Sequence, residues 1–220
     1  MTKEIVIAAY DRDLSWMSLF NSDIKRTVYR KGKKSDNESE FFIELNMGRC
    51  VHSFFNHIYM NYDNLSDYTF FAQDYPFDHW ENLIDVINNS TFEQNVTLRI
   101  GGYYGFHYNT VGSMWNMPQS EQFGGGRSLS CSSNGSPQAS PQSFNINLDM
   151  VWDDFFDCPH PQMYEFMPGG HFGITKEHVR LRSRELYKKV VDMLSENTDA
   201  PWAIERLECY IFDPKFKTKL

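Results

Sequence analysis

Near its N-terminus the chain reads Glu4-Ile5-Val6-Ile7-Ala8-Ala9, followed at once by Tyr10-Asp11-Arg12-Asp13. The first segment is mainly apolar and is β-branched in its first half, whereas the second segment is polar. A short apolar run that stops at a polar cluster is typical of a buried strand that ends in a loop. We therefore predict a buried strand over residues 4–9.

The segments that follow alternate between helical and extended patterns. The spacing of apolar residues predicts helices over residues 14–20 and 51–59, and short apolar runs predict strands over residues 27–29 and 68–72. Such alternation is typical of α/β proteins. We expect a single-domain α/β fold in which a central mixed sheet is flanked by helices.

The second half of the chain has a different composition. A weaker helix is expected around residues 80–87, and residues 112–143 are rich in Gly, Ser, Gln and Pro, which predicts a long flexible loop. Beyond the loop, the pattern predicts a glycine-interrupted strand over residues 166–175, a helix over residues 176–194 and a final helix over residues 202–211. A length of 220 residues fits one domain, so we expect the loop to be part of a domain that spans the whole chain.

Composition and charge exclude several classes of protein. Hydrophobic residues make up 41% of the chain, enough to bury a core and to exclude a disordered protein. The net charge of −8 is opposite to what a nucleic-acid-binding surface needs. No apolar run approaches the roughly 20 residues of a membrane helix and no signal peptide is evident, so we expect a cytoplasmic protein without a membrane span. The four scattered cysteines favour reduced thiols over disulfides or a zinc site.

Asp74 is the first candidate for chemistry. It follows the predicted strand 68–72, and open α/β sheets bind ligands beyond the carboxyl ends of their strands. Carboxylate oxygens are preferred ligands of Mg²⁺ and Mn²⁺, and such an ion would neutralise charge on a nucleotide leaving group. The alternative is a simple strand-ending turn, because Asp-x-Pro is common turn chemistry.

The loop after the first strand is the second candidate. The ring of Tyr10 could stack on a base, and the carboxylate of Asp11 could accept from a ribose hydroxyl. Asp13 has the simpler explanation of a helix N-cap. Arg49, near the start of its predicted helix, could meet a phosphate, although a surface ion pair is the usual alternative.

Glycines define the third candidate and acidic residues the fourth. Gly169 and Gly170 would let a ligand approach the backbone, with His171 beside them, but they could equally form a bulge. Glu205 lies in an otherwise apolar helical segment, where it could act as a general base toward an acceptor hydroxyl or simply pair with Arg206. Asp153 and Asp154 compete with Glu205 for the role of base.

Several segments together resemble a family of small, largely uncharacterised glycosyltransferase-like proteins that is widespread in fungi and bacteria. The segments that carry the resemblance are Tyr10-Asp11-Arg12-Asp13-Leu14-Ser15-Trp16, Asn46-Met47-Gly48-Arg49, Phe70-Phe71-Ala72-Gln73-Asp74, Phe172-Gly173-Ile174-Thr175-Lys176-Glu177-His178-Val179 and Glu205-Arg206-Leu207. The chain is also similar to small chlorovirus-encoded transferases. The resemblance covers most of the chain outside the predicted loop and depends on the order of many weak motifs.

The resemblance implies a GT-A-type nucleotide-sugar fold that uses Mn²⁺ or Mg²⁺. In that fold a D-x-D motif holds the metal, and Ala72-Gln73-Asp74 retains only its last acidic residue. The resemblance and the candidates above together suggest roles for four groups of residues. These are Asp74 for the metal; Ala9, Tyr10, Asp11 and Arg49 for the nucleotide; Gly169, Gly170 and His171 for the donor sugar; and Glu205, Asp153 or Asp154 for catalysis.

The leading hypothesis is therefore a metal-dependent glycosyltransferase that moves a hexose-type sugar from a nucleoside diphosphate, of the UDP type, to a glycan or other hydroxyl acceptor. The predicted loop could fold over the donor and exclude water. Two alternatives stay open. One is a catalytically silent carbohydrate-binding or interaction protein on the same fold, and the other is a metal-dependent phosphohydrolase.

Overall fold

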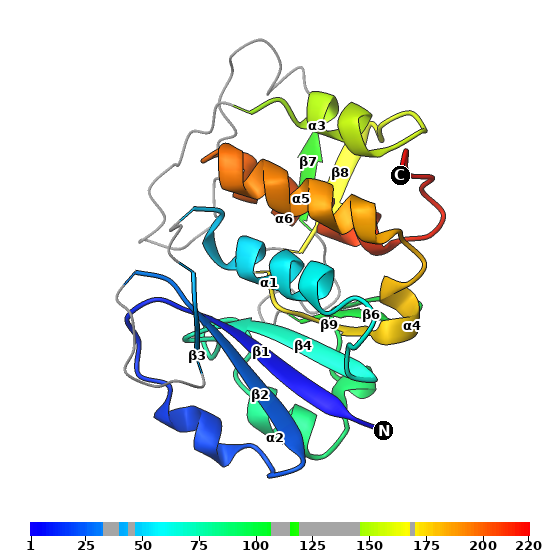
Figure 1. Ribbon diagram of the computed structural model, residues 1–220. Coiled ribbons are helices and arrows are strands. Elements are labelled where there is room, and N and C mark those ends of the chain that lie inside the picture. Colours follow the sequence, from blue (N-terminus) through cyan, green and yellow to red (C-terminus); the bar gives the residue numbers. More distant parts are fainter. Residues whose placement is uncertain (33–39, 44–46, 107–114, 119–145, 168–169) are drawn as a thin grey trace.

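A seven-stranded mixed sheet forms the centre of the protein. The computed structural model describes residues 1–32, 40–43, 47–106, 115–118, 146–167 and 170–220 (Figure 1). The strands lie in the order β3-β2-β1-β4-β9-β6-β5. Their bounds are β1 Lys3–Ala9, β2 Ile24–Arg30, β3 Glu40–Phe42, β4 Tyr68–Gln73, β5 Leu98–Ile100, β6 Tyr103–Gly105 and β9 Phe172–Thr175. The expected α/β class with a central mixed sheet is confirmed.

One half of the sheet is parallel and the other half is antiparallel. β3, β2, β1 and β4 are parallel neighbours. β9 pairs antiparallel with both β4 and β6, and β6 pairs antiparallel with β5. Ala9 of β1 lies opposite Arg30 of β2, and Ala8 lies opposite Gln73 of β4. The carboxyl ends of these three parallel strands therefore meet at one edge of the sheet.

The central strands are buried on both faces. Side chains alternate between the faces of a strand. Val6 and Phe71 belong to one apolar cluster, whereas Ile5, Ile7 and Phe70 belong to a second cluster on the opposite face. Burial on both faces explains why the first and fourth strands read as continuous apolar runs in the sequence.

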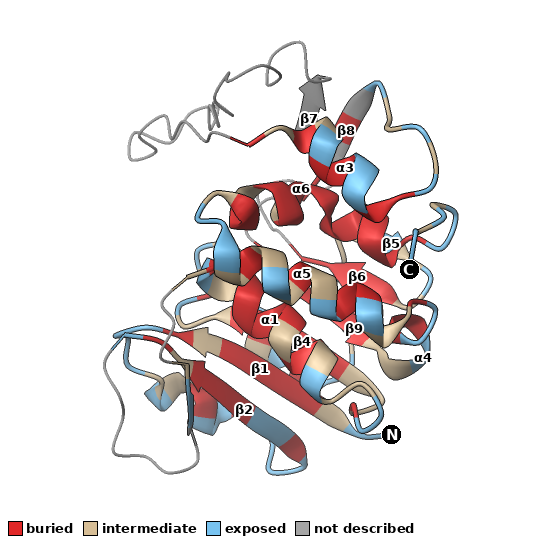
Figure 2. Cartoon of the chain, turned by 45° about the horizontal axis from the view of Figure 1, so that its top comes forward, coloured by how far each residue is buried: buried red, intermediate tan, exposed pale blue. Residues whose placement is uncertain are grey.

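Helices cover both faces of the sheet (Figure 1). On one face lie α1 (Arg49–Met60), α5 (Arg184–Glu196) and α6 (Ala200–Phe212), and α2 (Leu83–Asn88) lies on the other. The helix predicted over residues 51–59 is confirmed as α1, whose sheet-facing side is buried. Figure 2 shows that α6 is buried along most of its length. Polar residues on α6 therefore lie inside the protein and not in solvent.

A second, two-stranded sheet lies beside α6. It pairs β7 (Trp115–Pro118) with β8 (Met163–Phe166), and α3 (Leu148–Phe155) lies next to it (Figure 1). The prediction of one strand over residues 166–175 was wrong, because β8 and β9 belong to different sheets. β7 falls inside the range predicted as a flexible loop, and the rest of that range lies outside the described residues.

The helix predicted over residues 176–194 is broken in the structure. α4 (Lys176–Val179) ends early, and α5 begins after Ser183, whose hydroxyl oxygen accepts from the N–H of Leu186 at 3.1 Å. Between the two helices, the buried guanidinium of Arg182 donates to the carbonyl of Ile211 at 2.7 Å. The last carbonyls of a helix lack partners within it, and Arg182 binds one of them at the end of α6. A contact with a distant part of the chain therefore holds Arg182 in place.

Two further features complete the fold. The helix predicted over residues 14–20 is a short 3₁₀ helix, Ser15–Leu19. Asp13 does not cap it, since its carboxylate binds the N–H and hydroxyl of Ser15 and the capping position belongs to Leu14. None of the helices in the described part of the chain has both the length and the apolar character that crossing a bilayer requires.

Candidate functional site

The sheet has a topological switch point at its parallel edge. β2 lies on one side of β1 and β4 lies on the other, so the connections that leave β1 and β4 diverge. Open α/β sheets bind ligands in the crevice at the carboxyl ends of the strands at such a point. Ala9 ends β1 and Gln73 ends β4, which places Tyr10 and Asp74 side by side at this crevice.

Asp74 joins the two loops at the switch point. Its Oδ2 accepts a hydrogen bond of 2.9 Å from the backbone N–H of Tyr10, and its carbonyl accepts one of 3.2 Å from Nε1 of Trp16. Within the described residues, Oδ1 of Asp74 accepts no hydrogen bond. One carboxylate oxygen thus binds the loop that follows β1, and the other accepts no hydrogen bond from the described residues.

Tyr10 presents a half-exposed ring beside Asp74. The ring packs against Gly32, where an added Cβ would lie 2.5 Å from a ring carbon, and Gly32 has a φ of +79°. The Nη1 of Arg30 donates to the Tyr10 carbonyl at 3.0 Å, and Asp11 is exposed next to it. The ring is therefore backed by the chain on one side and open on the other, as a stacking surface for a planar ligand requires.

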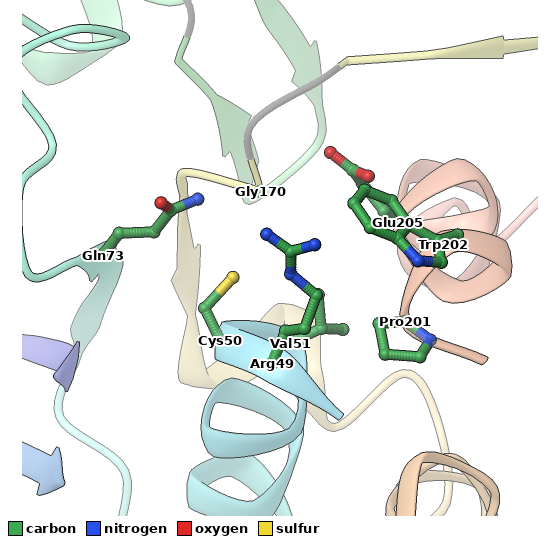
Figure 3. A pocket seen from close by; sticks show the side chains of 8 residues that line it. All are labelled: Arg49, Cys50, Val51, Gln73, Gly170, Pro201, Trp202 and Glu205. Atoms are coloured by element: carbon green, nitrogen blue, oxygen red, sulfur yellow. The ribbon is translucent and has the colours of Figure 1, made fainter. Parts of the chain in front are cut away.

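A pocket opens next to this crevice, with a volume of about 340 Å³ including its mouth (Figure 3). Its lining residues come from α1, β4, α6 and the segment just before β9. They are Arg49, Cys50, Val51, Gln73, Gly170, Pro201, Trp202 and Glu205. The pocket therefore joins the end of β4 to helices that are distant in sequence.

Arg49 occupies the centre of the pocket wall. Its guanidinium lies 4.3 Å from the ring centroid of Trp202, which is a cation–π contact, and Figure 3 shows the guanidinium in the middle of the lining side chains. Its φ is +49°, which is uncommon for a residue with a side chain, and it follows Gly48 with a φ of +71°. Backbone strain of this kind persists only where the surroundings hold it in place and is concentrated at functional sites.

Lys31 is the group that holds this strained segment. Its Nζ donates to the carbonyl of Arg49 at 2.8 Å and to the carbonyl of Met47, and its side chain is buried. Burial lowers the pKa of Lys31 to about 8, so the ammonium is still mainly charged at neutral pH. Two cations, Lys31 and Arg49, thus meet at the start of α1 in a protein of net charge −8.

Glu205 enters the pocket from α6 and is also half of an ion pair. Its Oε2 lies 3.1 Å from Nη1 of Arg206, which is fully buried and also donates to the carbonyl of Trp202 at 2.8 Å. The pairing with Arg206 that the sequence suggested is therefore present. The carboxylate still lines the pocket, so one residue has both a structural partner and access to a ligand.

Glu208, one helical turn beyond Glu205, is a titratable group that the sequence analysis did not identify. It is 3% exposed, and its Oε1 accepts a 2.8 Å hydrogen bond from the hydroxyl of Tyr103. Within the described residues its Oε2 has no hydrogen-bond partner. Burial, with a further contribution from Glu205, raises the pKa of Glu208 to about 8, although the bond from Tyr103 opposes the shift.

The predicted site residues lie at the switch point, in the adjoining pocket or away from both. Ala9, Tyr10, Asp11 and Asp74 meet at the crevice, and Arg49, Gly170 and Glu205 line the adjoining pocket. Gly170 has a φ of +61°, and no described atom lies within 4 Å of the place that a Cβ would take. His171 is fully buried and does not line the pocket, and Gly169 lies outside the described residues. Asp153 and Asp154 lie on the exposed side of α3 and do not line the pocket.

Sequence reasoning missed several residues of the site. Lys31, Cys50, Gln73, Trp202 and Glu208 carry no motif of their own. A local signal existed for two of them, because Trp202 and Glu208 lie three positions before and after Glu205 and so share its face of the helix. The others are brought to the site only by strand pairing and helix packing.

A metal site built from protein ligands alone is not formed by the described residues. Among them, no group of three or more His, Cys, Asp or Glu side chains is arranged to hold a metal ion. Asp74 offers one carboxylate oxygen that is not used by Tyr10. A divalent ion there would need ligands from a bound nucleotide and from water, which Mg²⁺ commonly uses.

The fold and the site define an α/β protein with a topological switch point at the carboxyl ends of its parallel strands and a charged pocket beside it. The chain belongs to the family DUF3431, described as "Protein of unknown function (DUF3431)", which matches residues 5–218. No curated protein and no solved structure matches the chain with significance.

Proposed function

We propose that this protein is a glycosyltransferase with a GT-A-like fold, which moves a sugar from a UDP-type nucleoside diphosphate sugar to a glycan or other hydroxyl acceptor. The observation that carries the proposal is the position of Arg49 and Glu205 in one pocket beside the switch-point crevice. An arginine suits a diphosphate, and a carboxylate suits the activation of a hydroxyl. A transferase needs both groups around one reacting centre.

The order of the parallel strands supports a nucleotide as the ligand. The order β3-β2-β1-β4 matches one half of the doubly wound sheets that bind nucleotides, and the crevice lies at the corresponding switch point. In this proposal Ala9, Tyr10 and Asp11 hold the nucleoside. The Tyr10 ring stacks on the base, and the Asp11 carboxylate accepts from a hydroxyl of the ribose.

The local charge supports an anionic donor. Arg30 ends β2, Lys31 follows it, and Arg49 begins α1, so three cationic residues gather at the carboxyl edge of the sheet. A diphosphate that lies between the crevice and the pocket would be bound by Arg49, with Lys31 holding the Arg49 backbone in place. Phosphate recognition by a planar guanidinium is favourable because two donors can bind one phosphate.

The pocket beyond the diphosphate would receive the donor sugar and the acceptor hydroxyl. Gly170 borders it without a side chain, and Gly169 and His171 flank Gly170 in the chain. Glu205 would accept the proton of the acceptor hydroxyl as that oxygen attacks the sugar. Asp153 and Asp154 are weaker candidates for this role because they do not line the pocket.

In this proposal Mn²⁺ or Mg²⁺ is bound partly by the protein and partly by the donor and water. Asp74 would supply one oxygen, and the phosphates of the donor and water would supply the remaining ligands. The ion, when bound, would neutralise the charge that develops on the leaving diphosphate. The protein's own residues would orient the donor and exclude water from it.

The proposal is tested by thermal unfolding with UDP, GDP and CDP, each with and without Mn²⁺, followed by product analysis with the matching sugar nucleotides. Stabilisation that needs Mn²⁺, together with release of the nucleoside diphosphate, is the expected result. Stabilisation by glycans without turnover would instead identify a silent carbohydrate-binding protein. Release of inorganic phosphate would identify a phosphohydrolase, and no response to any nucleotide would contradict the proposal.

A further inference from the structure

Behind the pocket, α6 carries two carboxyl groups in different surroundings. Glu205 is paired with the charged Arg206 and reaches the pocket, whereas Glu208 is buried and meets only the hydroxyl of Tyr103. Residues three apart on a helix lie on the same face. A carboxyl group that is buried without a cation beside it keeps its proton more readily than a carboxyl group in water does.

We propose that Glu208 is a positioning residue that keeps its proton so that Glu205 is the single negative charge of the pocket. This inference rests on the proposed function for its catalytic meaning, but the division of charge between the two residues can be tested without any substrate. Three observations carry it. They are the burial of Glu208, the absence of a partner for Oε2 among the described residues, and the location of Glu205 beside Arg206.

The groups around Glu208 come from three elements. α6 contributes Glu205 and Cys209, β6 contributes Tyr103, and α1 contributes Cys50. The tyrosine donates to Glu208, and both thiols are neutral, since burial, reinforced by nearby carboxyl groups, raises the pKa of each above its usual value. Arg49 and Lys31 lie near Cys50, but among the described residues no cation pairs with the carboxylate of Glu208. An ionised Glu208 would therefore lack a direct partner and would place a second negative charge behind the pocket. An anionic donor would then bind less tightly.

Cys50 provides a local reporter because it lines the same pocket. Burial, followed by the charge of Glu205 and more weakly by that of Glu208, raises the pKa of Cys50, although Arg49 and Lys31 oppose the shift. The thiolate, which is the form that reacts with iodoacetamide, is therefore disfavoured. The alkylation rate of Cys50 should rise tenfold per pH unit and then bend to a lower slope near pH 8, where Glu208 gains a negative charge and Lys31, whose pKa is also about 8, loses its positive charge. This readout depends on electrostatics in the pocket and not on turnover.

The experiment measures alkylation of the Cys50 peptide by mass spectrometry between pH 6 and pH 10. Glu208→Gln should make the bend smaller and leave only the part that Lys31 contributes, because the amide imitates the protonated acid and cannot ionise. Tyr103→Phe should move the bend to higher pH, because it removes a bond that favours the carboxylate. Glu177→Gln, at a side chain that is 70% exposed, should behave as the wild type.

An unchanged bend in Glu208→Gln would overturn the inference. If that variant does not fold, Tyr103→Phe decides, and an unmoved bend in it would likewise overturn the inference. UDP affinity measured over the same pH range should fall roughly threefold to tenfold more in the wild type than in Glu208→Gln, since the loss of charge from Lys31 is common to both proteins. A protein that binds no UDP at any pH but shows the expected alkylation profiles would contradict the proposed function while supporting the role of Glu208.

Discussion

The backbone N–H of Tyr10 donates a 2.9 Å hydrogen bond to Oδ2 of Asp74, 64 positions further along the chain. This bond joins the loop that follows β1 to the loop that follows β4, across the switch point of the sheet. It fixes the half-exposed ring of Tyr10 relative to the carboxylate of Asp74. The two residues that the sequence analysis assigned to different ligands, nucleoside and metal, therefore behave as one unit.

The first prediction separates the two roles of Asp74. Asp74→Asn keeps an oxygen that can accept from Tyr10 but loses the charge, so we expect a stable protein that has lost Mn²⁺-dependent nucleotide binding. Asp74→Ala loses the hydrogen bond as well and should cost a further 1–3 kcal/mol, about the cost of an unpaired donor. Isothermal titration and chemical denaturation measure the two effects.

The matched control for Asp74 is Asp78→Asn, four residues away in the same loop. Asp78 is exposed and lies near His79. Among the described residues it forms no hydrogen bond or ion pair with the loop that follows β1. Its substitution should change neither binding nor stability. Full Mn²⁺ dependence in Asp74→Asn would show that Asp74 only joins the two loops.

The second prediction concerns Arg49. Arg49→Ala should weaken UDP binding by roughly 10- to 100-fold, because hydrogen bonds to charged groups contribute about 1.5–3 kcal/mol. Arg49→Lys should recover only part of this affinity, since lysine lacks the planar fork. Arg99→Ala is the matched control, because Arg99 also lies over an aromatic ring, 5.2 Å from that of Tyr104, but on β5 and not in the pocket. Equal affinities in the two alanine variants would remove Arg49 from the binding site.

The third prediction uses Glu205→Gln to compare catalysis with stability. If Glu205 is the general base, transfer should fall by roughly 10²- to 10⁴-fold while UDP still binds. We expect a loss of about 1–3 kcal/mol in stability, less than for a fully buried pair, because Arg206 keeps its bond to the Trp202 carbonyl and its place over the ring of Phe166. The turnover and the melting temperature of the variant are measured together. A fully active variant would exclude Glu205 from the mechanism.

The fourth prediction concerns the pH dependence of stability. His57 lies on the buried side of α1, and its Nδ1 lies 3.1 Å from the hydroxyl of Tyr29. Burial lowers the pKa of His57 to about 4, although the nearby Glu4 opposes the shift. The unfolded chain, with a histidine pKa of about 6.5, therefore binds a proton that the folded protein does not bind between pH 6.5 and pH 4.

The folded protein loses the stabilisation by His57 as the pH falls. The contribution of His57 to stability is full above pH 6.5 and is lost as the pH falls toward 4, by about 1.4 kcal/mol per pH unit. Urea denaturation of the wild type and of His57→Gln at several pH values isolates it, since the other titrating groups, including the buried His52, are common to both proteins. A stability difference that does not change with pH would contradict the prediction.

Several elements of the fold followed from local patterns in the sequence. The apolar runs that became β1 and β4 and the helical spacing that became α1 each report on their own burial, because residues that alternate or repeat within a few positions define the buried side of a single element. The position of Asp74 at the end of a buried strand was equally local. These features needed no knowledge of distant residues.

Other local patterns gave wrong predictions, because contacts with distant residues determine the structure there. The helix predicted over residues 176–194 is interrupted where Arg182 turns inward to the carbonyls that end α6. Ser183 was a local sign of a new helix start, but the apolar spacing around it favoured continuity. The predicted strand 166–175 was divided between two sheets for the same reason, since only pairing partners elsewhere in the chain determine which sheet a strand joins.

The sequence by itself thus determined the α/β class, the buried strands and the acidic and aromatic residues at their ends. Only the tertiary structure decided that Gln73 of β4, Arg49 of α1 and Glu205 of α6 line one pocket, with Glu208 buried behind it. The physical reason is that burial and charge coupling depend on distances between elements. Sheet order and helix packing set those distances, and the local period of a sequence does not contain them.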